Sequence, residues 1–377
     1  MKILQTPVRF YPYIGGVEKY VLDLSKELVK RGHDITVVCA NDPASKKEEI
    51  LYRINVKRVN SIGKIANTNI SPYFPLKILG EDFDIIHAHF PTPWNLDWSV
   101  LISLIKRKPL ILTYHNDANN HPTNKLLADI YNRTFLKIAL KIAKKIIITQ
   151  QRYLEYSKFI KNYKKKTVVI PIGVDTNIFK PLNLKKIKNT IFFLGVLDKF
   201  HRYKGIDYLL RALVTVKKKI TDIKLIVGGK GELIKEYRKL VNELDLENNV
   251  KFLGYMKNKE ILKAYNQSQI FILPSIGHEE GFGIVLLEAM ACKTPVICTD
   301  IVGVAEDVKE NNAGIVIRPK DAEELSSAII KILRNNAAQK TMGENALELV
   351  RQKYSLGKMA ESFEKIYAEV KWAKQKE

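Results

Sequence analysis

The chain has 377 residues, 46% of them hydrophobic and 27% charged, which is enough for two globular domains with sizeable cores. No uninterrupted apolar run approaches the roughly 18–20 residues that a transmembrane helix needs, which argues against an integral membrane protein. The formal net charge of +22 is the unusual bulk property, and it favours an anionic partner.

The N-terminus and the cysteines indicate a reduced compartment. Residues 1–7 form a first strand that is too short and too polar for a signal peptide. The three cysteines, Cys39, Cys292 and Cys298, are odd in number and lack the spacing of a metal site. We therefore expect a cytoplasmic protein.

Short apolar segments alternate with helical ones along the chain, which predicts parallel sheets with crossover helices. A helix over residues 16–30, closed by Gly32, is expected after the first strand. Six strands are expected in the first half, at residues 2–8, 34–39, 83–89, 110–115, 145–149 and 167–171. Six more are expected in the second half, at residues 190–196, 223–227, 250–253, 270–273, 295–298 and 314–317.

Two sets of strands predict two doubly wound, Rossmann-like α/β domains that face each other across a cleft. The hinge is expected in a polar stretch that Pro171, Gly173 and Pro181 punctuate. The expected domains are residues 1–175 and 176–353, followed by a C-terminal helix, 354–377, that packs back on the first domain.

Positive charge is concentrated between residues 121 and 190, where 16 basic and three acidic residues give a net charge of +13. Lysines interleave with apolar residues over 135–145, which predicts a helix with a basic side. The Lys-rich 125–166 region therefore indicates contact with an anionic membrane surface and a peripheral location on its inner face. A merely solvated lysine face explains the same pattern, and both interpretations stay open. Nucleic acid is not expected, because basic and aromatic residues do not interleave as in single-strand binders.

Polar residues follow several expected strands, and open parallel sheets bind ligands at those strand ends. After the first strand, Gly15 and Gly16 would let backbone N–H groups approach a phosphate or a sugar, with Glu18 beside them. A plain turn explains the paired glycines equally well.

Histidines lie at the ends of the third and fourth strands. His87 and His89 are two residues apart and so share one face of a strand, while His115 precedes Asn116 and Asp117. A metal would need a third ligand that the sequence does not make evident, so no metal site is expected. Hydrogen bonding in the cleft and a structural role both stay open for these histidines.

Two cations follow the first strand of the second half. Arg202 and Lys204 lie where that strand gives way to a helix, an arrangement that suits a diphosphate. Gly229, after the next strand, would let a base or a ribose approach the backbone. A solvated basic loop and a simple turn are the alternatives.

Glu280 and Glu288 bracket a loop that carries Gly281, Phe282 and Gly283 and leads from the strand at 270–273 into a helix. Free N–H groups at a helix start favour phosphate oxygens. Carboxylates repel phosphate and suit sugar or ribose hydroxyl groups instead. The pattern suggests a phosphorylated sugar at the C-terminal edge of a parallel sheet.

In combination, these segments resemble family 4 of the retaining glycosyltransferases, the group 1 type with the GT-B fold, over nearly the whole chain. The resemblance is carried by Gly15-Gly16-Val17-Glu18, Asp84-Ile85-Ile86-His87-Ala88-His89, Thr113-Tyr114-His115-Asn116-Asp117, Pro171-Ile172-Gly173-Val174-Asp175, Lys204-Gly205 and the Glu-x7-Glu signature from Glu280 to Glu288. Each motif is weak alone, and their shared order and spacing make the match strong.

The resemblance implies transfer of a sugar from a nucleotide-diphosphate-sugar donor to a lipid-linked or glycan acceptor, with retention, without a metal and without another cofactor. His115, Glu280 and Lys204 would be catalytic, with Lys204 or Arg202 neutralising the leaving diphosphate. The donor would be bound by Gly15, Gly16, Arg202, Lys204, Gly229, Glu280, Gly281, Phe282, Gly283 and Glu288. The acceptor-side candidates are Glu18, His87, His89, Asn116 and Asp117. Glu280 as a covalent nucleophile is the alternative to front-face attack.

The chain departs from the family pattern at two places that matter. The family often has an arginine where this chain has Val196, which makes Arg202 a candidate substitute. Lys293 replaces a turn glycine, so a left-handed lysine is expected there. A sugar-nucleotide epimerase of the same fold and, more remotely, a basic nucleic-acid-binding module are the alternative functions.

Overall fold

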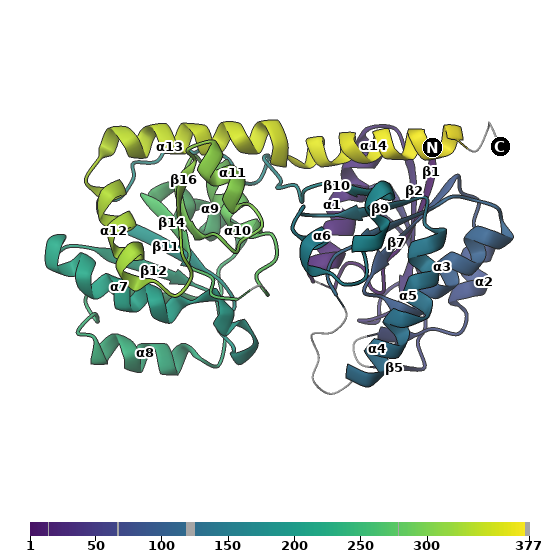
Figure 1. The fold of residues 1–377 in the computed structure, drawn as a ribbon, viewed down its shortest axis with the longest axis horizontal. Helices are drawn as coiled ribbons and strands as arrows, with labels where there is room; N and C mark the ends of the chain where they lie inside the picture. Colours follow the sequence, from purple (N-terminus) through teal and green to yellow (C-terminus); the bar gives the residue numbers. More distant parts are fainter. Residues whose placement is uncertain (14, 66–67, 118–124, 278, 374–377) are drawn as a thin grey trace. The chain divides into compact units, whose positions relative to one another are not determined.

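A computed structural model describes the chain apart from residues 14, 66–67, 118–124, 278 and 374–377, and it leaves out the side chains of residues 125–128, 156 and 373 (Figure 1). The end of the expected 354–377 segment and part of the Lys-rich region therefore lie outside the description. The chain divides into two compact units, Met1–Ile172 with Leu356–Glu377 and Gly173–Ser355. These boundaries compare with the expected 1–175, 176–353 and 354–377.

The first domain is built on an eight-stranded sheet in the order β10-β9-β8-β7-β1-β2-β4-β3. All paired neighbours are parallel except β3, which runs antiparallel to β4. The strands are β1 (Lys2–Thr6), β2 (Asp34–Ala40), β3 (Glu48–Leu51), β4 (Ile54–Val59), β7 (Ile85–Phe90), β8 (Leu110–Tyr114), β9 (Lys145–Ile148) and β10 (Thr167–Val169). All six expected strands of this half are present. The strand order reverses between β1 and β7, the kind of position where doubly wound sheets bind ligands.

The expected strands omit β3 and β4, and also a small hairpin of β5 (Gly63–Ile65) and β6 (Thr68–Ile70). Tyr52 and Arg53 join β3 to β4 with φ angles of 53° and 66°. Asn-Gly or Asp-Gly usually fills such a left-handed pair, so the sequence carries no hairpin signal here. Ile54 and Val56 nevertheless bury one face of β4 beside β2.

Helices cover both faces of this sheet because successive strand residues point to opposite sides. On β1, Ile3 packs in the core beneath α1 and α14, and Leu4 packs in the core beneath α2, α3 and α5. The helices are α1 (Gly16–Lys30), α2 (Phe74–Leu79), α3 (Pro93–Ile105), α4 (Lys125–Arg133), α5 (Phe135–Ile142), α6 (Tyr153–Tyr156) and α14 (Leu356–Ala373), with a 3-10 turn η3 (Lys161–Lys166). The helix expected over 16–30 is confirmed, and Gly32 after it has a φ of 85°.

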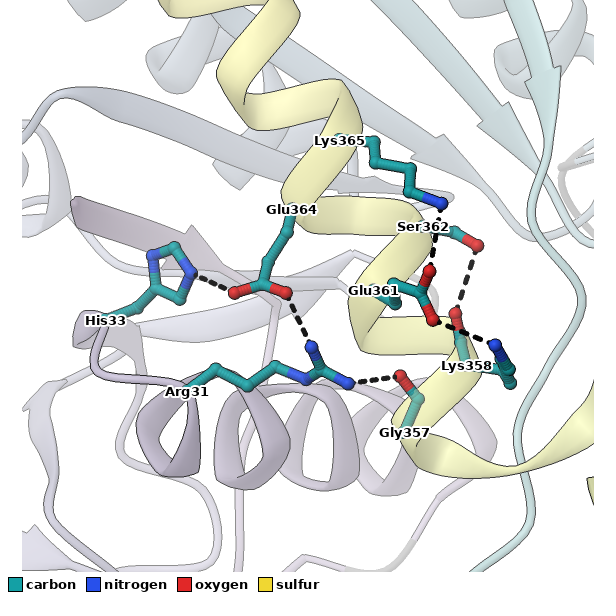
Figure 2. Close-up of polar contacts among 8 residues, drawn as sticks. All are labelled: Arg31, His33, Gly357, Lys358, Glu361, Ser362, Glu364 and Lys365. Carbon is teal, nitrogen blue, oxygen red and sulfur yellow. Dashed lines mark hydrogen bonds and ion pairs between the residues drawn. The ribbon is translucent and has the colours of Figure 1, made fainter.

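The C-terminal helix α14, yellow in Figure 1, packs on the first domain beside α1. Phe363 and Tyr367 are fully buried in the core beneath it. Figure 2 shows the polar attachment, in which Glu364 accepts from Arg31 Nη1 at 2.7 Å and contacts His33 Nε2 at 2.9 Å. Arg31 Nη2 also donates to the Gly357 carbonyl at 2.9 Å. The helix therefore belongs to the first domain although it follows the second in sequence.

The second domain contains a wholly parallel six-stranded sheet in the order β13-β12-β11-β14-β15-β16. Its strands are β11 (Thr190–Leu194), β12 (Lys224–Gly228), β13 (Val250–Gly254), β14 (Ile270–Leu273), β15 (Val296–Thr299) and β16 (Gly314–Ile317). The helices are α7 (Ile206–Lys219), α8 (Ile234–Glu243), α9 (Asn258–Gln267), α10 (Ile284–Ala291), α11 (Ala305–Glu310), α12 (Ala322–Leu333) and α13 (Asn336–Leu349), with the short helices η4 (Lys199–Lys204) and η5 (Val350–Tyr354). All six expected strands are present, and the order reverses between β11 and β14. The predicted class of two Rossmann-like α/β domains is confirmed.

Lys293 has a φ of 58°, which confirms the left-handed lysine expected in the turn after α10. Within the residues that the structure describes, no helix combines the length and the apolar character needed to span a bilayer.

Candidate functional site

The strand order brings the candidate residues to two sheet edges, one in each domain. In the first domain, Gly15 and Gly16 follow β1, and His89 is the second-last residue of β7, the strand beside β1. In the second domain, Lys204 follows β11 and Glu280 follows β14, the strand paired with β11. Each pair of segments flanks the point where the strand order reverses, so general topology alone marks these edges as ligand sites.

The first-domain cluster is centred on His89 and His115. Nδ1 of His89 lies 3.2 Å from Nε2 of His115, and Nε2 of His89 lies 2.8 Å from Oε1 of Gln5. Tyr20 packs edge-to-face on His115 with ring centroids 4.9 Å apart. Burial lowers the pKa of His115 to about 3 and that of His89 well below its ordinary value, so both rings are neutral near pH 7.

Neutrality fixes the direction of the hydrogen bonds in this cluster. Oε1 of Gln5 can only accept, so Nε2 of His89 carries the proton and Nδ1 does not. Nδ1 of His89 then accepts from Nε2–H of His115. His115 is left with an unprotonated Nδ1, which can accept a hydrogen bond from a hydroxyl group.

Glu18 lies on the first turn of α1, close to the paired glycines. Its side chain is buried, and burial raises its pKa while the nearby Arg9 charge opposes that shift. A Cβ atom on Gly15 would lie 2.3 Å from Oε2 of Glu18, whereas a Cβ on Gly16 would meet nothing within 4 Å. A side chain on Gly15 would therefore displace the Glu18 carboxylate, whereas Gly16 borders open space.

Two of the acceptor-side candidates are occupied by structural contacts. His87 is fully buried, with Nδ1 at 2.8 Å from the Tyr367 hydroxyl and Nε2 at 2.7 Å from Thr113 Oγ1. Asp117 accepts from Ser157 Oγ at 2.8 Å and from the Tyr114 hydroxyl. The structural role that the sequence leaves open for His87 is the one observed, and His89 is equally buried. Asn116 remains exposed beside them.

The second-domain cluster is an ion pair. Nζ of Lys204 lies 2.8 Å from Oε2 of Glu280, and both side chains are largely buried. Ser275 Oγ donates to the same oxygen at 3.1 Å. Among the described residues, Oε1 of Glu280 has no hydrogen-bond partner, so this oxygen can accept from a ligand.

Glycines fix the position of this ion pair. A Cβ on Gly195 would lie 2.7 Å from Cδ of Lys204, so the missing side chain makes room for the lysine stem. Gly205 has a φ of 68°, and a Cβ there would lie 2.1 Å from the Pro274 carbonyl oxygen. The Ile276 amide also donates to the Tyr203 carbonyl at 2.6 Å. The end of η4 is thereby held against the loop that carries Glu280.

The remaining glycine candidates differ in how closely they are packed. Gly229 has a φ of 124°, and a Cβ there would lie 1.8 Å from the Gly195 carbonyl oxygen. Gly283, at the start of α10, has a φ of 80°. A Cβ on Gly281 would meet nothing within 4 Å. Phe282 is buried against Tyr354 with ring centroids 5.6 Å apart, so only its backbone amide can serve a ligand.

Glu288 lies in the second turn of α10, which begins at Ile284. Its Oε2 accepts from the Tyr265 hydroxyl at 3.0 Å, and the residue is half-buried. This hydrogen bond orients the carboxylate, and the sequence pattern does not reveal it.

Arg202 does not join Lys204. Its Nη2 lies 2.6 Å from Oε1 of Glu236 on α8, and its side chain is 52% exposed. The expected pair of cations is therefore divided: Lys204 contacts the Glu280 loop, and Arg202 contacts a surface helix. Val196, at the position of the family arginine, is also exposed.

Sequence reasoning missed four residues that hold these groups in place: Gln5, Tyr20, Ser275 and Tyr265. Only Ser275, directly before the Glu280 loop, carries a local signal. The other three come from distant segments and meet the site only through the strand order.

Comparison with known families agrees with this arrangement. The model of "Glycosyltransferase Family 4" matches residues 14–178, and that of "Glycosyl transferases group 1" matches residues 174–349. The chain belongs to glycosyltransferase family 4. It is therefore a transferase that acts on sugars.

Relatives of this family 4 glycosyltransferase match over most of their length. An uncharacterized glycosyltransferase of Methanocaldococcus jannaschii is 29% identical, over 98% of this chain and 99% of the relative. A phosphatidyl-myo-inositol mannosyltransferase of Mycobacterium leprae is 25% identical, over 94% of this chain and 93% of the relative.

Solved structures show the same GT-B fold. Anabaena HepE in complex with UDP superposes with a TM-score of 0.77 at 22% identity, over 98% of this chain and all of that one. A sucrose-phosphate synthase from Thermosynechococcus elongatus gives a TM-score of 0.75 at 22% identity, over 99% of both chains.

Proposed function

We propose that this family 4 enzyme transfers a sugar, with retention, from a nucleotide-diphosphate-sugar donor to a lipid-linked or glycan acceptor. The observation that carries the proposal is the Lys204–Glu280 ion pair, beside the reversal point of the second sheet. An ammonium group with three N–H donors can keep one on Glu280 and direct the others to a diphosphate.

The donor would be held by two kinds of group, those that bind an anion and those that accept hydrogen bonds from hydroxyl groups. Lys204 and the backbone amides of Gly16, Phe282 and Gly283 would bind the diphosphate, which is anionic. Oε1 of Glu280, Glu288 and Nδ1 of His115 would accept from hydroxyl groups of the sugar and the ribose. Gly229 would allow the nucleoside to approach the backbone.

The reaction needs negative charge to be stabilised where the glycosyl–phosphate bond breaks. Lys204 would supply that positive charge in place of a divalent metal, so we propose that the enzyme works without a metal or another cofactor. The acceptor hydroxyl would attack the same face that the diphosphate leaves, and the leaving phosphate would take its proton.

The acceptor and the location form a separate part of the proposal. The Mycobacterium leprae relative is named for mannosyl transfer and for phosphatidyl-myo-inositol, which supports a lipid-linked acceptor here. The excess of basic residues in the first domain supports an anionic membrane surface as partner of the Lys-rich 125–166 region. We propose a cytoplasmic enzyme that is peripheral on the membrane.

A thermal-shift screen over nucleotide diphosphate sugars, run with and without EDTA, tests the donor and the metal together. A donor at 100 times its Kd should stabilise the fold by about 2.7 kcal/mol, and EDTA should leave that shift unchanged. Product analysis with the stabilising donor and no acceptor then separates a transferase from an epimerase. A shift that EDTA abolishes would contradict the metal-independent proposal.

Gly16→Ala separates binding from folding. The new Cβ meets nothing within 4 Å, and alanine suits the first position of α1 better than glycine. We expect an unchanged or slightly higher melting temperature together with a loss of roughly tenfold or more in kcat/KM, because the methyl group would block the approach of the diphosphate. Gly15→Ala is the contrasting variant, since its Cβ would lie 2.3 Å from Oε2 of Glu18 and would displace that carboxylate. Full activity of Gly16→Ala would remove Gly16 from the donor site.

A further inference from the structure

The helices that cover the two sheets differ in what they expose. Eight large apolar side chains on α2–α5 of the first domain are between 39% and 64% exposed. They are Leu76 and Leu79 on α2, Leu101, Leu104 and Ile105 on α3, Ile130 on α4, and Phe135 and Ile138 on α5. Across the described residues of the second domain, no α-helix exposes a large apolar side chain in this way. A lysine- and isoleucine-rich composition would affect both domains alike, so it does not explain the difference.

These eight side chains, the apolar row, lie on helices that are neighbours. α2 contacts α3, α3 contacts α5, and α5 contacts α4, as Figure 1 shows for the first domain. The inner faces of the same helices are satisfied, since Phe74, Leu96 and Leu140 are fully or almost fully buried against the sheet. Exposed apolar side chains on four neighbouring helices point to a binding face rather than to scattered exposure.

The charge around the apolar row is positive. Arg133, Lys137 and Lys141 are exposed on α4 and α5. The sequences of α2–α5 contain only two acidic residues, Asp97 and Asp129, and Asp97 is engaged by the Tyr131 hydroxyl at 2.7 Å. Bulky apolar groups flanked by cations are complementary to a bilayer surface that carries anionic headgroups.

A cavity of about 380 Å³ lies where α3 and α5 end. Leu104 of the apolar row and Ile142 line it, and so do the cationic residues Arg107, Lys108, Lys144 and Lys145. Among the residues that the structure describes, Glu369 is the one carboxylate in the lining, and it pairs with Lys145 at 2.6 Å. Apolar walls with cations around them suit the phosphate of a lipid headgroup and its first methylene groups.

The lysine tract of residues 158–166 is organised differently. Nζ of Lys166 donates to the carbonyl oxygens of Lys141 and Ala143 at 2.7 and 2.8 Å. The Tyr163 hydroxyl donates to the Lys137 carbonyl at 3.4 Å. Part of this tract therefore caps the end of α5 instead of presenting charge, and η3 buries no residue and exposes no large apolar one.

We propose that the outer face of α2–α5 is the membrane-contact surface of this enzyme and that it binds anionic phospholipid through the apolar row and the cavity beside Leu104. This inference rests on the proposed membrane partner. Within the Lys-rich 125–166 region it keeps α4 and α5 and leaves out residues 158–166, and it adds α2 and α3. Insertion of the apolar row into the interface makes binding only partly sensitive to salt, whereas a lysine tract alone would release when charges are screened.

Co-sedimentation with vesicles tests the assignment. The full chain is mixed with vesicles of phosphatidylcholine alone and of phosphatidylcholine with phosphatidylglycerol, at low and at physiological salt. The unmodified chain should bind the anionic vesicles at both salt concentrations. The triple variant Leu76→Ser, Leu101→Ser, Leu104→Ser should bind them roughly tenfold or more weakly, because three exposed apolar groups are lost. The control Lys161→Gln, Lys164→Gln, Lys165→Gln should bind within about twofold of the unmodified chain, because its lysines lie outside the proposed surface.

The vesicle experiment can support or overturn the membrane-contact surface without affecting the transferase proposal. Far-UV circular dichroism and donor thermal shifts of each variant report folding and donor binding, so the transferase proposal is judged independently. If the lysine control loses binding and the serine variant keeps it, the membrane partner stands and this surface is overturned. If neither vesicle binds the unmodified chain, both membrane proposals fail. A dimer that light scattering detects and the serine variant abolishes, without vesicle binding, would instead assign the apolar row to a second copy.

Discussion

Replacing Lys204 with methionine is expected to lower kcat about 100- to 1,000-fold, which corresponds to about 3–4 kcal/mol of transition-state stabilisation. Lys204 is the one cation that the described structure places against Glu280, and its stem fits into space that Gly195 leaves. Loss of the ammonium group removes charge compensation as the diphosphate departs. Single-turnover measurements with saturating donor isolate this step from binding.

Arg202→Met is the matched control, because Arg202 lies on the same short helix and carries the same charge. Its guanidinium contacts Glu236 at the surface, so we expect less than about a threefold change in kcat. The opposite ranking, with Arg202 essential and Lys204 dispensable, would show that Arg202 substitutes for the family arginine absent at Val196. Lys204→Arg should recover part of the activity lost in Lys204→Met if charge is what matters.

The same geometry bears on how Glu280 acts. A nucleophilic carboxylate needs an oxygen free to attack the sugar carbon. Oε2 is held by both Lys204 and Ser275, and the proposed donor site uses Oε1 to accept from a sugar hydroxyl group. An ammonium at 2.8 Å stabilises the anion and makes it a weaker nucleophile. Glu280→Gln keeps a hydrogen-bond acceptor but loses the charge, so an orienting role predicts a smaller loss of turnover than Lys204→Met. The contacts of Oε2 therefore favour a Glu280 that orients the donor.

The features of the fold that could be predicted from the sequence are those that depend on residues close together in the chain. The helix over 16–30 was predictable to the residue, because its apolar spacing and the glycine after it are local features. The hairpin of β3 and β4 was not, because Tyr52 and Arg53 adopt left-handed conformations that their side chains do not announce. The predicted fold class is correct without this hairpin, since the alternation of strands and helices along the chain determines the class.

The site residues, too, were predictable only where the sequence signal is local. Lys204 and Glu280 stand in motifs at strand ends, so their edge of the sheet was predictable, but their 2.8 Å contact depends on how Gly205 packs on Pro274. His87 shows the converse case. It shares the strand motif with His89, yet α14 brings Tyr367 to its Nδ1 from 280 residues away. No pattern within the strand reports such a partner.

Acidification is expected to unfold the first domain well before the second. Burial lowers the pKa of His87 and of His115 to about 3 and that of His89 well below its ordinary value. In the unfolded chain each would bind a proton near pH 6.5, so the unfolded state holds more protons between about pH 6.5 and 3. The free energy of unfolding should therefore fall by about 1.4 kcal/mol per histidine for each pH unit below 6.5. At pH 5, His87 and His115 together would cost about 4 kcal/mol, and His89 adds to that cost, so the loss is comparable to the whole stability of some domains.

Tryptophan fluorescence isolates this effect, because Trp94, Trp98 and Trp372 all belong to the first domain. Asp97 opposes the trend, since burial raises its pKa to about 6 and acid relieves that cost. Because Asp97 is present in every variant, its contribution to the pH dependence cancels when the variants are compared. In urea titrations from pH 7.5 to 4.5, His87→Phe should be less stable at pH 7.5, where Thr113 and Tyr367 lose a partner, but its stability should fall less steeply with acid by about 1.4 kcal/mol per pH unit. Phe363→Leu is the control, because Phe363 packs on His87 without titrating and its loss should be the same at every pH. Parallel pH curves for His87→Phe and the unmodified chain would mean that His87 takes up its proton in the folded domain as readily as in the unfolded chain.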